Sequence, residues 1–399
     1  IETPLLIKPP PEGARDYVVP SRVNPGRFYA LPQSPQLYKQ ILMVAGLDRY
    51  FQLAKCLRDE DLRADRQPEF TQIDLEMSFC TPEDIYTLVE GIMTALWKEA
   101  GQPITTPFQR LTYKDSMNTY GTDKPDLRFE LPITDVTEIA KTSGFSVFTN
   151  AITNNGVVKC LRVPKGGSFT RTEIEHLTEV AKTHHSKGLA WAKVANNTLE
   201  SSITKYLTPD VQTKLITTTH ATNGDILLFV AESWKIACTA LGQVRLAIAE
   251  QQKLSKQGTW KFAWITDFPL FSWNEETHTW DAEHHPFCMP REEDLKYLEK
   301  EPGKVHASTY DLTLNGTELL SGSVRITNPE LQSKIFKMIG LSQEEATTKF
   351  GFLLDAYKYG GPTHAGVGIG FDRIVALLSG TNDIREVIAF PKNKKAEGV

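Results

Sequence analysis

The stretch RDEDLRADRQPEFTQID, residues 58–74, is the part of the sequence that decides the fold. An alternating strand enters it, a loop with charges of both signs follows, and a second alternating strand leaves it. On the leaving strand Phe70, Gln72, Asp74 and Glu76 share one face, because successive side chains point to opposite sides of a strand. An ordinary amphipathic strand facing water leaves the crowded charges unexplained. The pattern instead favours a binding floor, with arginines for phosphate and Phe70 as a stacking surface.

A second motif, HAGVGIGFDR at residues 364–373, has a glycine at every second position. This spacing differs from the G-x-G-x-x-G of dinucleotide-binding loops. Alternate glycines remove the side chains from one face of a strand, so that a flat ring can lie on the backbone. Arg373 follows at the expected start of a helix, where it can meet a phosphate. A close-packed sheet crossing explains the glycines alone equally well, but together with the first motif they favour a nucleotide site.

A third motif is the hairpin expected at residues 308–326, where Asn315-Gly316 is a strong type I′ turn signal. In a two-residue-loop register Asp311 becomes a diagonal neighbour of Glu318. Two carboxylates this close are unfavourable unless a cation lies between them, and magnesium bound to ATP phosphates would serve. One exposed acid and one structural acid remain the alternative.

Beyond this hairpin, Arg325 carries a planar guanidinium suited to a carboxylate partner. The histidines of the segment His284–Phe287 could suggest a metal site. Adjacent histidines usually point apart, however, and the sequence offers no third ligand, so a role in a pocket or loop is favoured over zinc.

The composition describes a globular chain. It has 399 residues, 40% hydrophobic and 23% charged, which is enough for two or three units with their own cores. A net charge of -5 argues against non-specific nucleic-acid binding by a polycation. The five cysteines have no metal-clip spacing and indicate free thiols in a reducing compartment, so we expect a cytoplasmic protein. No apolar run approaches the ~20 residues of a membrane span.

The lengths of the expected elements and the local composition predict an α+β protein in three segments. Residues 1–127 and 257–399 are rich in strands and motifs, whereas 128–256 has shorter elements and frequent Thr, Lys, Asn and Gly. We therefore expect an inserted α+β domain at 128–256. Because the chain starts at Ile1, as if within a strand, we expect a fragment. The principal elements predicted are helices at 34–47, 81–97 and 373–379, and strands at 50–57, 68–79 and 365–370.

These motifs resemble the signatures of class II aminoacyl-tRNA synthetases. The stretch 58–74 looks like motif 2, residues 366–373 look like motif 3, and Ile1–Pro4 looks like the end of motif 1, which belongs to a dimer interface. Four further segments resemble the bacterial-type aspartyl synthetases, and the insertion resembles their GAD domain; the segments are PEGARD (11–16), QSPQLYKQ (33–40), HHPF (284–287) and GSVR (322–325). The resemblance covers essentially the whole chain, and we expect the family's N-terminal β-barrel, which reads the anticodon, to be missing from it.

The resemblance implies an antiparallel sheet flanked by helices and a two-step reaction in a homodimer. Aspartate and ATP give aspartyl-adenylate and pyrophosphate, and the aspartyl group then passes to the 3′ end of tRNA-Asp. No enzyme nucleophile is implied, since catalysis rests on positioning and charge neutralisation, chiefly by Arg58 and Arg373. The implied ATP-binding residues are Arg58, Asp59, Glu60, Gln67, Phe70, Glu318, Gly370, Phe371, Asp372 and Arg373, with Asp311 and Glu318 as magnesium ligands.

For the amino acid, the resemblance implies cations for the β-carboxylate and acceptors for the α-ammonium group. Arg325 and Lys39 are the cations, and Arg325 would reject asparagine because a neutral amide leaves a buried guanidinium unpaired. His284 would close over the substrate, and Glu12 would reach it from a mobile lid. The full implied aspartate set is Glu12, Ser34, Gln36, Lys39, Arg58, Gln72, Asp74, His284 and Arg325.

The sequence departs from the family at Leu320-Ser321-Gly322, where three glycines are usual, so we expect a bulkier floor near magnesium or ribose. The rivals are an asparaginyl synthetase, a non-catalytic synthetase paralogue and the GAD-bearing subunit of an amidotransferase. Arg325, the run 66–69 and the insertion argue against the first, and the retained motif arginines and acids argue against the others. The sequence leaves open whether tRNA-Asn is also charged.

Overall fold

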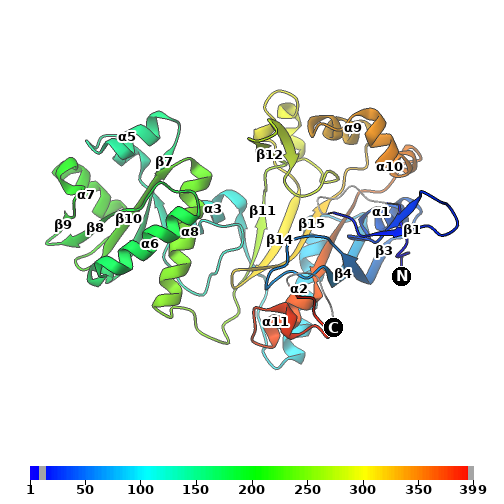
Figure 1. The fold of residues 1–399 in the computed structure, drawn as a ribbon, viewed down its shortest axis with the longest axis horizontal. Helices are drawn as coiled ribbons and strands as arrows, with labels where there is room; N and C mark the ends of the chain where they lie inside the picture. Colours follow the sequence, from blue (N-terminus) through cyan, green and yellow to red (C-terminus); the bar gives the residue numbers. More distant parts are fainter. Residues whose placement is uncertain (9–14, 394–399) are drawn as a thin grey trace. The chain divides into compact units, whose positions relative to one another are not determined.

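The computed structural model describes residues 1–8 and 15–393, and it has a mixed α+β architecture (Figure 1). Its Cα packing divides the chain into two compact units. The first contains residues 1–109, 266–312 and 318 onward, and the second contains residues 110–265 with 313–317. Each unit is described separately.

The first unit is built on antiparallel strands in the order β3-β4-β16-β15-β14, and the pairs β3–β4, β4–β16 and β16–β15 have defined registers. Its helices and strands are β1 (Val18–Pro20), β2 (Phe28–Ala30), α1 (Gln36–Val44), β3 (Arg49–Leu57), β4 (Glu69–Ser78), α2 (Pro82–Glu99), β12 (Phe271–Asn274), β13 (Thr279–Ala282), β14 (Thr309–Leu314), β15 (Thr317–Val324), α9 (Pro329–Met338), α10 (Gln343–Lys358), β16 (His364–Gly370) and α11 (Phe371–Leu378).

Local sequence signals explain several of these boundaries. Thr81 and Asp84 form a capping box at the start of α2, in which the Thr81 amide and hydroxyl both donate to the Asp84 carboxylate, at 2.8 and 2.7 Å. Asn315 and Gly316 both have positive φ, 52° and 88°, as a type I′ turn requires between β14 and β15. The strands expected at 50–57 and 68–79 form as β3 and β4, extended or shortened by one residue at their ends.

The register of the sheet gives it one polar and one apolar face. Glu76 pairs with Gly366, which pairs with Ser323, and the next row on that face joins Asp74, Gly368 and Ser321. Directly paired residues lie on the same side of a sheet, so all six belong to the polar face. Asp74 and Glu76 are buried more deeply than the neighbouring apolar residues of β4, which the sequence alone did not indicate.

The second unit is a five-stranded sheet with helices on both faces (Figure 1). The strand order is β6-β7-β10-β8-β9. One apolar cluster joins the sheet to α6 and α8, and another joins the opposite face to α4, α5 and α7. Its elements are β5 (Gln109–Thr112), α3 (Tyr113–Tyr120), β6 (Ile133–Asp135), α4 (Thr137–Ala140), α5 (Ser146–Thr153), β7 (Val157–Val163), α6 (Arg171–Thr183), β8 (Ala190–Ala195), β9 (Thr198–Glu200), α7 (Pro209–Thr218), β10 (Ile226–Glu232), α8 (Trp234–Gln251) and β11 (Phe262–Thr266).

This unit extends beyond the insertion expected at 128–256, and two glycines show why. Gly121, at the end of α3, lies so close to Gly242 of α8 that a Cβ on it would meet the Cys238 carbonyl oxygen at 2.2 Å. A Cβ on Gly242 would lie 2.7 Å from the Gly121 carbonyl oxygen. The two backbones therefore pack directly on one another, and α3 becomes part of the second unit.

Two expectations from composition can be compared with the described residues. All five cysteines are free and buried. Within the described part of the chain, the helices include none with the length and apolar character needed to cross a bilayer.

Candidate active site

Two buried cations and two buried carboxylates meet on the polar face of the sheet. Lys39 reaches the sheet from α1, and its Nζ lies 3.0 Å from both carboxylate oxygens of Asp74 and 3.1 Å from Oε2 of Glu76. All three side chains are at most 2% exposed. Burial raises the pKa of Asp74, against the opposing effect of Lys39. Lys39 and Asp74, both predicted for aspartate binding, therefore lie together.

Arg325 completes this group from the end of β15. Its Nε donates to Oε1 of Glu76 at 2.9 Å and its Nη2 donates to Oε2 at 3.1 Å, which is a bidentate pair. Burial by itself would raise the pKa of Glu76, but Arg325 and Lys39 together lower it to about 2. Glu76 in turn raises the pKa of Arg325 against the effect of burial. Both groups are therefore charged at neutral pH.

The remaining amino group of Arg325 contacts two neutral partners. Nη1 donates to the Ser323 hydroxyl at 2.6 Å and lies 2.7 Å from Nε2 of His285. A guanidinium can only donate, so Nε2 of this imidazole is the acceptor in the contact with Arg325, while the Phe287 amide donates to Nδ1 at 3.2 Å. Nδ1 lies 3.5 Å from Sγ of Cys288. Burial and the neighbouring Arg325 lower the pKa of His285 well below its usual value, consistent with a neutral ring.

The structure separates the two adjacent histidines. His284, predicted to close over the substrate, places Nε2 3.5 Å from Oδ1 of Asp311, whereas His285 contacts Arg325. Burial opposes a charge on His284, but Asp311 raises its pKa. His284 thus faces Asp311, a predicted metal ligand, and His285 faces Arg325, a predicted amino-acid ligand.

The glycines of β16 make room for polar side chains of β4. A Cβ on Gly366 would lie 1.9 Å from Oε2 of Glu76, and one on Gly368 would lie 3.3 Å from the Gln72 amide. The expectation of an open backbone floor for a flat ring is wrong at Gly366, because the Glu76 carboxylate already covers it. Gln72 itself accepts a contact from Cys56 Sγ at 3.4 Å.

Leu320 and Ser321, which stand where the family usually has glycines, lie on opposite faces of the sheet. Leu320 pairs with Ile369, which pairs with Ile73, so Leu320 lies on the apolar face and is 1% exposed. Ser321 instead lies on the polar face opposite Gly368. The expected bulk at the floor of the site is therefore one serine, and the leucine belongs to the core.

The loop between β3 and β4 and its flanking strand ends carry several of the residues predicted to bind the nucleotide. The Arg58 guanidinium lies over the Phe70 ring, 5.1 Å from its centroid, and its Nε donates to the Gln33 carbonyl oxygen at 3.4 Å. Arg58 and Phe70, predicted to bind phosphate and to stack on adenine, therefore lie together, and their roles stay predictions. Glu60 forms a partly exposed ion pair with Arg66 at 3.0 Å, and the Asp59 amide donates to the Arg15 carbonyl oxygen at 3.2 Å.

Helix α11 carries the predicted phosphate arginine. Arg373 Nη1 donates to the Glu318 carbonyl oxygen at 2.8 Å and lies 3.6 Å from the Glu318 carboxylate, while Nη2 lies 3.8 Å from Asp65. The Asp372 carboxylate accepts from the Thr71 amide at 2.9 Å, so this predicted ATP ligand anchors α11 to β4. Phe371, at the start of α11, is 41% exposed.

The predicted magnesium ligands can be assessed from their own surroundings. Oδ1 of Asp311 is buried and, among the residues that the structure describes, has the 3.5 Å contact with His284 and no shorter hydrogen bond. The carboxylate of Glu318 is more open, at 39% exposure. Among the described residues, no three histidine, cysteine or carboxylate side chains form a metal-binding group. Two carboxylates fit a magnesium ion that takes its other ligands from phosphates and water.

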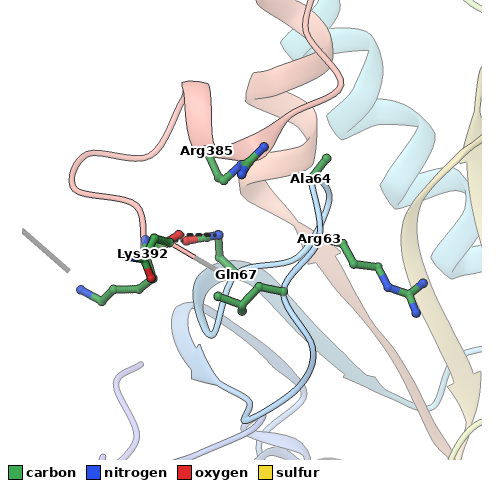
Figure 2. A pocket seen from close by; sticks show the side chains of 7 residues that line it. Arg63, Ala64, Gln67, Arg385 and Lys392 are labelled. Atoms are coloured by element: carbon green, nitrogen blue, oxygen red, sulfur yellow. Dashed lines mark hydrogen bonds between the residues drawn. The ribbon is translucent and has the colours of Figure 1, made fainter. Parts of the chain in front are cut away.

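A separate pocket of about 310 Å³ lies between the 58–74 loop and the C-terminal segment (Figure 2). Arg63, Gln67 and Lys392 are among its lining residues, but Lys39 and Arg325 are not. The Gln67 amide is paired with the Lys392 main chain: Nε2 donates to the carbonyl oxygen at 3.3 Å, and Oε1 accepts from the amide at 2.8 Å. Gln67 therefore fastens the loop to the C-terminal segment, and its contact with ATP stays a prediction.

The other predicted aspartate ligands lie around α1 or outside the described residues. The Ser34 hydroxyl accepts from the Gln36 amide at 3.3 Å. The side-chain Nε2 of Gln36 is buried and has no hydrogen-bond partner within residues 1–8 and 15–393, as expected of a group that waits for a ligand. Glu12 lies outside the described residues.

Sequence reasoning did not include Glu76, His285 and Ser323 in the site. The alternation of β4 already placed Glu76 on the polar face, two positions from Asp74, and this signal could have identified it. Ser323 likewise stands two residues before Arg325. No sequence signal chose between His284 and His285, because their orientations depend on how the segment crosses the sheet.

Comparison with known protein families gives the same class of protein as the sequence motifs. Residues 1–394 match the family tRNA synthetases class II (D, K and N). The chain therefore belongs to the class II tRNA synthetases of this group.

The curated relatives identify the subgroup that this chain resembles. It is 52% identical over 397 residues to the Aspartate--tRNA(Asp/Asn) ligase of Syntrophomonas wolfei, covering 99% of this chain and 68% of the relative. It is 50% identical over 398 residues to the Aspartate--tRNA ligase of Ruminiclostridium cellulolyticum, covering 99% of this chain and 67% of the relative. The chain thus spans about two thirds of their length.

Proposed function

We propose that the chain activates L-aspartate with ATP and transfers it to the 3′ end of tRNA-Asp. The observation that carries this proposal is the buried pair of cations, Lys39 and Arg325, beside Asp74 on the polar face of the sheet. Two cations suit the β-carboxylate of aspartate, and Asp74 suits its α-ammonium group. The relatives named for aspartate ligation support the same substrate.

In the proposed first step, the α-carboxylate oxygen of aspartate attacks the α-phosphorus of ATP. A new P–O bond forms, the bond to the β-phosphate oxygen breaks, and pyrophosphate leaves. Arg58 would neutralise charge on the α-phosphate while Phe70 stacks on adenine, and Arg373 would hold the γ-phosphate. Asp311 and Glu318 would hold magnesium, which supplies positive charge to the phosphates when bound. In the second step, a terminal hydroxyl of tRNA takes the aspartyl group and AMP leaves.

The proposal includes a homodimer in the cytoplasm. On β3, the outermost strand of the sheet, Phe51 and Leu53 are 63% and 64% exposed. They continue the apolar face of the sheet, since Leu53 pairs with Ile73 and Phe51 pairs with Leu75. An exposed apolar patch beside the N-terminal segment, which resembles motif 1, suits a second copy of the chain.

Pyrophosphate exchange tests the proposed activity directly. We expect the wild-type chain to exchange pyrophosphate into ATP with aspartate and not with asparagine. Arg325→Leu should abolish this exchange, because it removes a cation predicted to bind the substrate β-carboxylate and leaves Glu76 with Lys39 as its one remaining cationic partner. Arg162→Leu, which breaks an Arg–Asp pair in the second unit, is the matched control and should retain activity. Near-normal exchange by Arg325→Leu would contradict the assignment.

Charging of tRNA-Asp and tRNA-Asn by the full-length protein then tests the second step. Relatives at similar identity have names that specify both Asp and Asn or Asp alone. Aspartylation of tRNA-Asp is the expected result, and charging of tRNA-Asn distinguishes the two kinds of relative.

A further inference from the structure

Glu76 lies at the centre of the buried charge cluster, although none of the predicted roles includes it. Its side chain is fully buried, and its two oxygens accept from Nε and Nη2 of Arg325 and contact Nζ of Lys39, at 2.9, 3.1 and 3.1 Å. It is thus the described residue that touches both cations proposed to recognise the substrate carboxylate.

The hydrogen bonds of Arg325 show which edge of its guanidinium Glu76 occupies and which edge it leaves open. A guanidinium has five N–H groups. Glu76 accepts two of them, and Ser323 and His285 take the two of Nη1. One N–H of Nη2 is left, on the edge that Nη2 shares with Nη1. A carboxylate approaching that edge meets a free donor and competes on Nη1 only with neutral acceptors.

The fit of Glu76 depends on the strand beside it. Because a Cβ on Gly366 would lie 1.9 Å from Oε2 of Glu76, only a glycine there lets the carboxylate lie flat over β16. Aspartate at position 76 would be one methylene too short to fill the same space. Glu76 and Gly366 therefore act together to fix the plane of the Arg325 guanidinium.

Glu76 is also unsuited to bind the substrate itself. Both of its oxygens are occupied by cationic donors of the protein, whereas Asp74 forms an ion pair with a single cation, Lys39, and a hydrogen bond with the Tyr50 side chain. Two cations and two carboxylates leave the cluster neutral before a ligand arrives. Glu76 thus neutralises and orients the cations, and Asp74 remains the carboxylate predicted to meet the substrate ammonium group.

We propose that Glu76 is a positioning residue for amino-acid specificity, acting through Arg325 and Lys39 to present their remaining donors to a side-chain carboxylate. This inference rests on the proposed function. It predicts that removing the charge of Glu76 weakens aspartate binding and reduces the preference for aspartate over asparagine, while ATP binding is retained.

The test compares Glu76→Gln with wild type in pyrophosphate exchange. Loss of one charged hydrogen-bond pair should raise the KM for aspartate roughly 10- to 100-fold. The KM for ATP and kcat should remain close to wild type, and the aspartate-to-asparagine ratio of kcat/KM should fall. Glu76→Asp keeps the charge and should recover part of the aspartate affinity.

A control and a milder variant keep the result interpretable. Glu90→Gln makes the same change at another buried carboxylate, which accepts from the Phe108 amide, and it should leave the KM for aspartate unchanged. Ser323→Ala removes one neutral partner of Nη1 and keeps both buried carboxylates, and it should raise the KM for aspartate by about 10-fold or less.

Two outcomes would overturn the inference. One is an unchanged KM for aspartate in both Glu76→Gln and Ser323→Ala. The other is a parallel rise of both KM values, as a general loss of structure would give. A wild-type chain without aspartate-dependent exchange would instead refute the proposed function, so the two failures are distinguishable.

Discussion

At the scale of single residues, burial and neighbouring charges determine the protonation state of the histidines in the site. Burial lowers the pKa of His285 and Arg325 lowers it further, while burial also lowers the pKa of His364. The folded state therefore resists a proton that the unfolded chain binds below pH of about 6.5. Stability from these histidines is present above that pH and is lost as the pH falls. The pKa of His284 is raised, so its effect has the opposite sign: the stability that it contributes is present at low pH and is lost as the pH rises through its folded-state pKa.

This difference predicts the pH dependence of a substitution. In His285→Gln, the slope of the free energy of unfolding between pH 5 and 6 should fall by about 1.4 kcal/mol per pH unit, because one proton fewer is taken up on unfolding. Urea unfolding at several pH values measures it. His176→Gln, on the exposed side of α6, is the control. An unchanged slope in His285→Gln would show that this ring is protonated in the folded state.

At the scale of elements, close approaches of backbone decide which glycines are required. Gly242 lies in the middle of α8, where helix propensity alone disfavours glycine. It is tolerated because α8 packs against Gly121 without space for a side chain. Gly91 lies in α2, with no atom within 4 Å of the Cβ position. The same residue type is therefore structural in one helix and dispensable in another.

Alanine substitutions test this contrast. Gly91→Ala should stabilise the fold by about 0.5–1 kcal/mol, as expected for an unobstructed helix position. Gly242→Ala should instead destabilise it by about 1–3 kcal/mol, because the new methyl group collides with the Gly121 backbone. Thermal or denaturant unfolding measures both. Stabilisation by Gly242→Ala would refute the close packing of α3 on α8.

At the scale of the whole molecule, the exposed edge strand β3 is the feature that suits binding of a second copy of the chain. Phe51 and Leu53 extend the apolar face onto β3, where most of their surface is exposed. Isolated exposed apolar residues are common, but a continuous row on an edge strand is a recognised site of association.

Leu53→Lys tests the proposed dimer. The substitution places a charge in the middle of the patch, so the chain should sediment as a monomer at concentrations where the wild type is a dimer. Tyr359→Lys, at a residue that is 91% exposed beyond the end of α10, is the control and should sediment as the wild type does. A monomeric wild type would contradict the dimer itself.

Much of the fold could be predicted from the sequence because its signals are local. Alternation of side chains located β3 and β4, the Asn315-Gly316 pair located a turn, and Thr81 with Asp84 located the start of α2. These depend on residues within a few positions of each other, where backbone geometry is set by side-chain type. The family was identified in the same way, from contiguous motifs.

Only the tertiary structure decided which side chains meet. Glu76 and Arg325 are 249 positions apart, and their bidentate pair follows from the register of β4, β16 and β15. The same register turned Leu320 into the core and Ser321 toward the site. The path of the segment 284–287, which belongs to none of these strands, brought His285 rather than His284 to Arg325. Such contacts depend on how distant strands align, and a one-residue shift in register would exchange the two faces of the sheet.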